Sequence, residues 1–152
     1  FNIEYYMRAR AYAHVLRTGY YVTWRTDSLT RCYQRNLVTN YHVFHHKLKK
    51  FMEEQEIFKT LEKAYYDNVL ANMTQILIYG IFRPNSMRTY SESKKICRSV
   101  HEDEIVRAAL QNNGKEGNSA RRILMFFFER EYYGIVNLIC KSSYFVLRRL
   151  RR

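Results

Sequence analysis

Residues 56–82, EIFKTLEKAYYDNVLANMTQILIYGIF, decide the fold class. Apolar side chains recur there every three or four residues, which is the period of one face of an α-helix. Pro84 follows, and proline ends a helix because it lacks the backbone N–H donor. The stretch therefore predicts a long helix with one buried face. The expected core positions are Phe58, Leu61, Tyr65, Val69, Met73, Ile76 and Tyr79.

The helical period continues on both sides of this stretch. Residues 37–54 carry a second apolar stripe, made of Leu37, Tyr41, Phe44, Leu48 and Phe51. The polar composition near Gln55 leaves open whether 37–54 and 56–82 form one long helix or a hairpin of two. Beyond Pro84, we expect helices over 87–100, 102–110, about 119–128 and 134–151, with a loop at 112–119 and Ser119 as an N-cap. The predicted fold class is mainly α, a bundle-like helical region.

The first 35 residues have a different character. Residues 1–13 have helical spacing, but five consecutive β-branched or aromatic residues at 20–24, after Gly19, predict a strand. Thr26-Asp27-Ser28 then supplies short polar side chains that end a strand and form a turn. Arg25 and Arg31 flank this turn and favour a phosphate or carboxylate ligand. Since one strand is not stable alone, we expect its sheet to lie in a preceding part of a longer chain.

This segment resembles the family 2 glycosyltransferases, enzymes of the GT-A fold that use nucleotide-sugar donors. Phe1-Asn2-Ile3-Glu4-Tyr5 resembles the family's Phe-Asn-x-x-Tyr helix start, 14–16 its short strand, and 20–31 its aromatic strand and turn. The specific match covers roughly the first 35 residues. In the family, a Gly-Glu-Asp signature with the catalytic base precedes this helix. The resemblance implies that this base, and the nucleotide-binding half with its Asp-x-Asp motif, lie before Phe1.

The resemblance also implies a role for the turn. Arg25, Ser28 and Arg31 match the family pattern and would lie near the donor diphosphate, with Trp24 and Tyr21 as stacking candidates for a sugar or base. Val22 and Thr23 depart from it, because many family members carry an aromatic residue and an arginine there. The full enzyme would require Mg²⁺ or Mn²⁺, which this part would not bind. It would transfer a sugar to a glycan or lipid-linked acceptor, in bacterial cell-surface polysaccharide synthesis, whereas the present residues alone would be inactive.

The formal net charge of +12 indicates an anionic partner. Residues 121–152 hold eight basic and two acidic residues, a net +6. Their apolar stretch is interrupted by Lys141 and is shorter than the roughly 20 residues of a transmembrane helix, so we expect it to lie on an anionic membrane surface. This predicts a cytoplasmic protein, peripheral on the inner face of the cell membrane. The predicted contact residues are Phe145, Arg148, Arg149, Arg151 and Arg152.

Two other functions remain open. Arginines mixed with aromatic residues also suit a basic helical nucleic-acid-binding domain, although no helix carries a dense basic stripe with base-reading Asn or Gln. Phe126-Phe127-Phe128 could form an oligomerisation patch. We favour the glycosyltransferase, with 1–35 as the end of its catalytic domain, 36–111 as a helical region and 119–152 as a basic tail.

Histidines, acids and cysteines give weaker signals. His42 and His46 lie one helical turn apart, a spacing that suits a transition metal, but no Glu or Cys nearby completes a ligand set, so we predict no metal site. Glu102-Asp103-Glu104 is expected to stabilise a helix start, not to perform acid–base catalysis. Cys32, Cys97 and Cys140 are widely spaced and odd in number, which argues against a disulfide framework.

Overall fold

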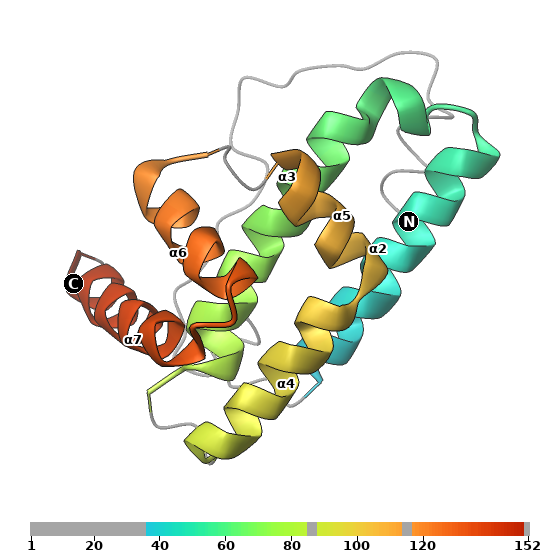
Figure 1. Ribbon diagram of the computed structural model, residues 1–152. Coiled ribbons are helices and arrows are strands. Elements are labelled where there is room, and N and C mark those ends of the chain that lie inside the picture. Colours follow the sequence, from blue (N-terminus) through green and yellow to red (C-terminus); the bar gives the residue numbers. More distant parts are fainter. Residues whose placement is uncertain (1–35, 85–87, 114–116, 151–152) are drawn as a thin grey trace, which may run out of the picture. The chain divides into compact units, whose positions relative to one another are not determined.

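The computed structural model describes residues 36–84, 88–113 and 117–150. The chain divides into two units, Phe1–Cys32 and Tyr33–Arg152, and the described residues all belong to the second. They form six α-helices and one π-helical turn without any strand, which confirms the mainly α class (Figure 1). The helix and strands predicted over 1–35 lie outside the described residues.

Helices α2 (Leu37–Glu54) and α3 (Phe58–Ile76) are separate, which answers the question left open by the sequence. Glu56 between them has a φ of 57°, in the left-handed region that ends a helix. The amide of Ile57 donates to the carbonyl of Met52, which closes the turn. The predicted bounds of 37–54 are those of α2.

Helix α3 is the central packing element. It contacts α2, α5 and α6, and Figure 1 shows it passing between them. Val69, Leu70 and Met73 are completely buried. At its end, the helix widens into a π-helical turn, Leu77–Ile81. The amide of Phe82 donates there to the backbone carbonyl of Leu77. The apolar period correctly predicted that Tyr65, Val69, Met73 and Ile76 are buried. It did not predict the π turn, where each hydrogen bond spans one residue more than in an α-helix.

Helix α4 (Tyr90–Glu102) begins at a capping box. The hydroxyl of Thr89 accepts from the amide of Glu92, and the carboxylate of Glu92 accepts from the amide of Thr89. Because this box fixes the start, the prediction of a helix from residue 87 was too early. Helix α5 (Glu104–Asn113) follows after one residue, Asp103.

Helices α6 (Ser119–Glu129) and α7 (Tyr133–Leu150) pack against each other. The side chain of Asn118 accepts from the amide of Arg121, so Asn118 is the N-cap and the prediction of Ser119 was wrong by one residue. Glu131, with a φ of 57°, lies in the turn that joins the two helices. Phe128 and Tyr133, on either side of this turn, are both buried in the core.

The core departs from the predicted stripes at particular positions. Phe44 and Leu61 were expected inside, but their side chains are 49% and 43% exposed. His45 takes the place of Phe44 on the buried face of α2, between Tyr41 and Met52. Phe126, Phe127 and Phe128 do not form one exposed patch, because Phe128 is buried and Phe127 is partly buried. Only Phe126 is exposed, and the guanidinium of Arg130 lies over its ring.

Candidate functional site

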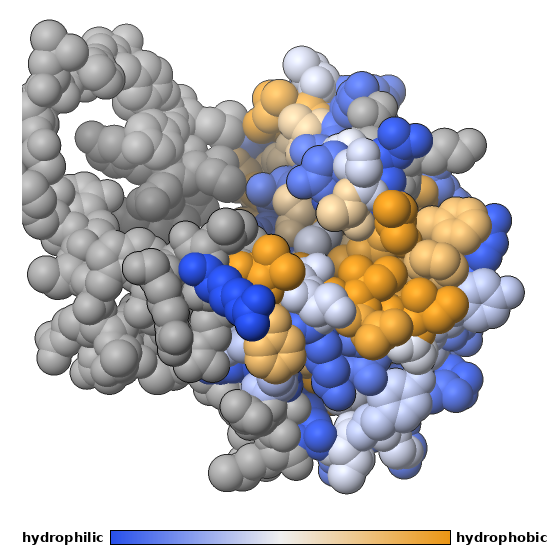
Figure 2. Space-filling view, turned by 90° about the vertical axis from the view of Figure 1, so that its left-hand side faces the viewer, coloured by the Kyte–Doolittle hydropathy of each residue, from blue (hydrophilic) through white to orange (hydrophobic). Residues whose placement is uncertain are grey.

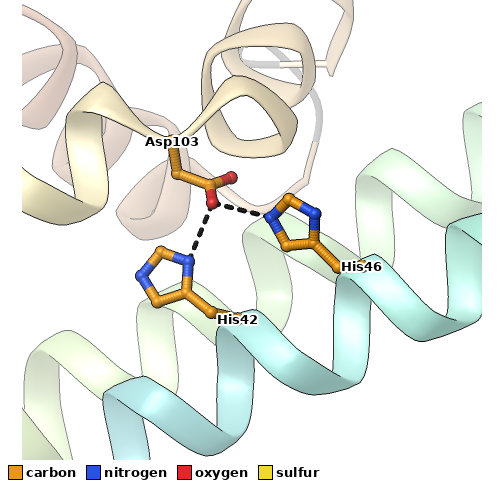
Figure 3. A group of neighbouring side chains, drawn as sticks. All are labelled: His42, His46 and Asp103. Carbon is orange, nitrogen blue, oxygen red and sulfur yellow. Dashed lines mark hydrogen bonds and ion pairs between the residues drawn. The ribbon is translucent and has the colours of Figure 1, made fainter.

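Two histidines of α2 meet an aspartate from the junction between α4 and α5. His42 and His46 are one turn apart on α2, so both side chains leave the helix on the same side. Asp103 lies opposite them, and Figure 3 shows both imidazole rings directed at its carboxylate. Sixty-one residues separate His42 from Asp103 in sequence.

A single carboxylate oxygen of Asp103 accepts hydrogen bonds from both histidines. Nδ1 of His42 is 2.8 Å from Oδ2 of Asp103, and Nε2 of His46 is 3.0 Å from the same atom. A carboxylate can only accept, so each facing ring nitrogen carries a hydrogen and donates. The Asp103 side chain is 10% exposed, whereas those of His42 and His46 are 27% and 46% exposed. The carboxylate of Asp103 is therefore shielded from solvent, whereas solvent reaches the imidazole rings, above all that of His46.

The second oxygen of Asp103 caps α5. Oδ1 accepts from the amides of Ile105 and Val106, at 2.9 and 3.1 Å. Burial alone would raise the pKa of Asp103, but the hydrogen bonds from His46, Val106 and His42 outweigh it and lower the pKa below its usual range. The sequence prediction that this acid stabilises a helix start is confirmed for Asp103, which has a further role toward α2.

His45 lies beside the cluster but faces the core. Its side chain is 1% exposed and packs edge-to-face against the ring of Tyr41. Burial lowers its pKa to about 4, with the charges of His46 and His42 acting in the same direction and that of Asp103 against it. Nε2 of His45 is 3.4 Å from the amide nitrogen of Asn72, while its Nδ1 has no hydrogen-bond partner among the described residues. His45 is therefore a neutral core residue and not a third donor of the cluster.

The sequence had supplied the two histidines but not their partner. Asp103 was identified as a helix-start residue, and no local pattern tells which helix such a residue faces. Only the packing that brings the α4–α5 junction against α2 places its second oxygen there. The three donor atoms, His42 Nδ1 or Nε2, a ring nitrogen of His46 and a carboxylate oxygen of Asp103, lie within 4.8 Å of one another.

A second candidate site is the outer face of α7. Its exposed apolar side chains are 41–67% accessible and recur along the helix: Ile135, Leu138, Phe145 and Val146. At 100° per residue these four lie within one side of the helix, opposite the buried Val136 and Cys140. Figure 2, which faces the side where α6 and α7 lie in Figure 1, shows apolar patches set among hydrophilic side chains.

The predicted membrane-contact residues fall partly on this face. Phe145 is 53% exposed and Arg149 is also exposed. The side chain of Arg148, and residues Arg151 and Arg152, lie outside the described part of the chain. Within the described ranges, no helix combines the length and the apolar character needed to cross a bilayer.

A basic pocket adjoins this face. It has a volume of about 370 Å³ and lies between α7, the π turn and the start of α4. Arg83, Arg88 and Lys141 contribute cationic groups to its lining, and Phe145 forms part of its apolar wall. Tyr90 and Asn137 add polar atoms. Such a lining suits a phosphate or carboxylate group.

The residues predicted to contact a sugar donor lie outside the described residues. They are Tyr21, Trp24, Arg25, Ser28 and Arg31. Comparison of the chain with protein-family models, curated proteins and solved structures finds no match.

Proposed function

We propose that this chain is the C-terminal helical part of a family 2-like glycosyltransferase, and that α6 and α7 dock the enzyme on an anionic membrane surface. The order and spacing of the residues in 1–31 support the enzymatic half of the proposal, including the match at Arg25, Ser28 and Arg31. The outer face of α7 supports the membrane half.

The observation that carries the docking proposal is the pairing of apolar and basic side chains on one side of α7. Leu138 and Phe145 are more than half exposed, and Lys141 and Arg149 are exposed on the same side. Aliphatic and aromatic groups enter the interface between headgroups and acyl chains, while each nearby basic residue adds about 1 kcal/mol of attraction to anionic lipid. A helix of this kind lies in the membrane plane.

The adjacent pocket supports the same orientation. Lys141 and Phe145 belong both to the outer face of α7 and to the pocket lining. A lipid phosphate held by Arg83 and Lys141 would therefore lie beside the apolar side chains that enter the membrane. The apolar face and the cationic pocket complement the two parts of an anionic lipid.

Vesicle sedimentation tests the docking. We expect the full chain to sediment with phosphatidylcholine vesicles containing phosphatidylserine, and much less with phosphatidylcholine alone. Leu138→Glu and Phe145→Glu should each weaken binding about tenfold, because a carboxylate then faces the lipid. Leu61→Glu is the matched control, since Leu61 is also an exposed leucine but belongs to α3 and not to α7.

The outcomes separate the candidate functions. Equal loss of binding in Leu61→Glu and Leu138→Glu would contradict docking through α7. Steeply salt-dependent binding to RNA or DNA, without any binding to vesicles, would favour the nucleic-acid alternative.

The enzymatic half has its own test. A Gly-Glu-Asp within about ten residues before Phe1 in the parent reading frame is expected, and its absence would contradict the proposal. In the parent protein with Mg²⁺ or Mn²⁺, Arg25→Ala and Ser28→Ala should lower sugar transfer about tenfold or more, by loss of diphosphate contacts. Arg8→Ala, in the predicted preceding helix, should leave transfer unchanged.

A further inference from the structure

We propose that His42, His46 and Asp103 form a binding site for Zn²⁺ or a similar divalent transition metal. All three donor atoms lie within 4.8 Å of one another, and they come from two elements that are distant in sequence. The site is distinct from the Mg²⁺ or Mn²⁺ expected in the full enzyme, because hard cations of that kind prefer all-oxygen ligands.

The ligand types and spacing fit a zinc site. Two histidines at i and i+4 present nitrogen donors from one helix face, and one carboxylate completes a set of three. With metal–ligand bonds of about 2.1 Å, tetrahedral ligands lie about 3.4 Å apart. The two nitrogens are 2.8 and 3.0 Å from Oδ2, so small outward rotations of His42 and His46 make room for the ion.

The carboxylate is already held in place. Oδ1 of Asp103 accepts from two backbone amides at the start of α5, which leaves Oδ2 directed at the histidines (Figure 3). Such outer contacts fix the orientation of a ligand and strengthen metal binding. On the other side, the hydroxyl of Tyr65 donates to the carbonyl of His45 and anchors the turn of α2 that lies between the two histidines.

Binding requires the two facing ring nitrogens to give up their hydrogens. Each histidine would bind the metal through the lone pair of the ring nitrogen that now donates to Asp103, with its remaining hydrogen on the other ring nitrogen. His46 is nearly half exposed, so water can occupy the fourth position. The bound ion would fasten α2 to the α4–α5 junction, in place of the two present hydrogen bonds.

Calorimetric titration of the full chain with ZnCl₂ tests the site. We expect one saturable site with a micromolar dissociation constant, undisturbed by excess Mg²⁺. The melting temperature should rise by about 5 to 10 °C when free Zn²⁺ is about 100 times the dissociation constant. Co²⁺ should bind with visible d–d absorption that is displaced by Zn²⁺.

The variants separate metal binding from structural support. His42→Gln and His46→Gln should each weaken binding about tenfold or more. Asp103→Asn should do the same while α5 stays folded, because asparagine is also a good N-cap. His101→Gln is the matched control, since His101 also faces a carboxylate, that of Glu131 at 3.8 Å, but belongs to no such group of three within the described ranges. Absence of saturable binding, or binding equally retained in His46→Gln, would overturn the proposal.

Discussion

The hydroxyl of Tyr65 on α3 donates a hydrogen bond of 2.9 Å to the backbone carbonyl of His45 on α2. A reciprocal bond joins the hydroxyl of Tyr41 on α2 to the carbonyl of Val69 on α3, at 3.1 Å. Both tyrosines are buried, and burial raises the pKa of each. Two aromatic side chains therefore join α2 and α3 through polar contacts inside an apolar interface.

We predict that Tyr65→Phe lowers the free energy of unfolding by about 1 kcal/mol. The ring and its packing against Phe58 are kept, while the hydroxyl and its hydrogen bond to His45 are lost. Urea denaturation followed by circular dichroism measures the change. An unchanged midpoint would mean that this bond does not contribute to the α2–α3 interface.

The hydroxyl of Tyr133 gives the opposite expectation. It is buried without a hydrogen-bond partner in the part of the chain that the structure describes, and burial raises its pKa to about 12. Tyr133→Phe removes a polar group that is not satisfied in the folded state, so the free energy of unfolding should stay the same or rise by up to about 1 kcal/mol. The same urea experiment checks it, and a loss as large as that of Tyr65→Phe would contradict the structure around Tyr133.

The capping box of α4 predicts a dependence on acid. Hydrogen bonds from the amide and hydroxyl of Thr89 lower the pKa of Glu92 below the value of the unfolded chain, near 4.5. A group of this kind stabilises the fold fully above its unfolded pKa, and the contribution disappears as the pH falls through the folded pKa. Stability should therefore decline below about pH 4.5 more steeply in the wild type than in Glu92→Gln.

Thr89→Ala provides the control for this acid dependence. It should lower stability by about 1 kcal/mol at neutral pH, because the N-cap hydroxyl is lost. It should also reduce the difference in the free energy of unfolding between neutral and acid pH. Equal acid slopes in the wild type and both variants would show that the capping box is not the source.

The cysteines of α4 and α7 should be unreactive in the folded protein. Cys97 and Cys140 are completely buried and form no disulfide. Burial raises the pKa of Cys140 to about 12, and burial together with the nearby Cys140 raises that of Cys97. Since the thiolate is the nucleophile, iodoacetamide should modify neither residue until denaturant is added. Peptide mass spectrometry of a Cys32→Ser variant distinguishes the two, and rapid native labelling of either would contradict their burial.

The sequence predicted the helices better than the identity of their buried residues. Both ends of 37–54 were correct, because the apolar period ends where polar residues begin. The buried face was assigned through Phe44, but α2 turns His45 inward and leaves Phe44 half exposed. Residue type favours phenylalanine over histidine in a core, whereas the neighbouring rings of Tyr41 and Tyr65 and the amide of Asn72 accommodate the imidazole. These partners come from packing and not from the local sequence.

The candidate sites were predictable to different degrees. The outer face of α7 repeats with the helical period of its own sequence, so an exposed position for Phe145 needs no tertiary information, while its contact with a membrane stays a prediction. The cluster at Asp103 depends on a contact between residues 42 and 103, and helical periodicity carries no information about such a pair. The π turn at Leu77–Ile81 was missed because the apolar period of the predicted helix 56–82 continues through it.

The carboxylate of Asp103 couples the fraying of the start of α5 to the detachment of α2 from the α4–α5 junction. One carboxylate oxygen accepts hydrogen bonds from the amides of Ile105 and Val106. The other oxygen accepts from the rings of His42 and His46. Exchange of those two amide hydrogens with solvent deuterium requires Asp103 to release them, and fraying of α5 also frees the carboxylate from α2. The protection factors of two backbone amides on α5 thus measure how firmly a separate helix is attached.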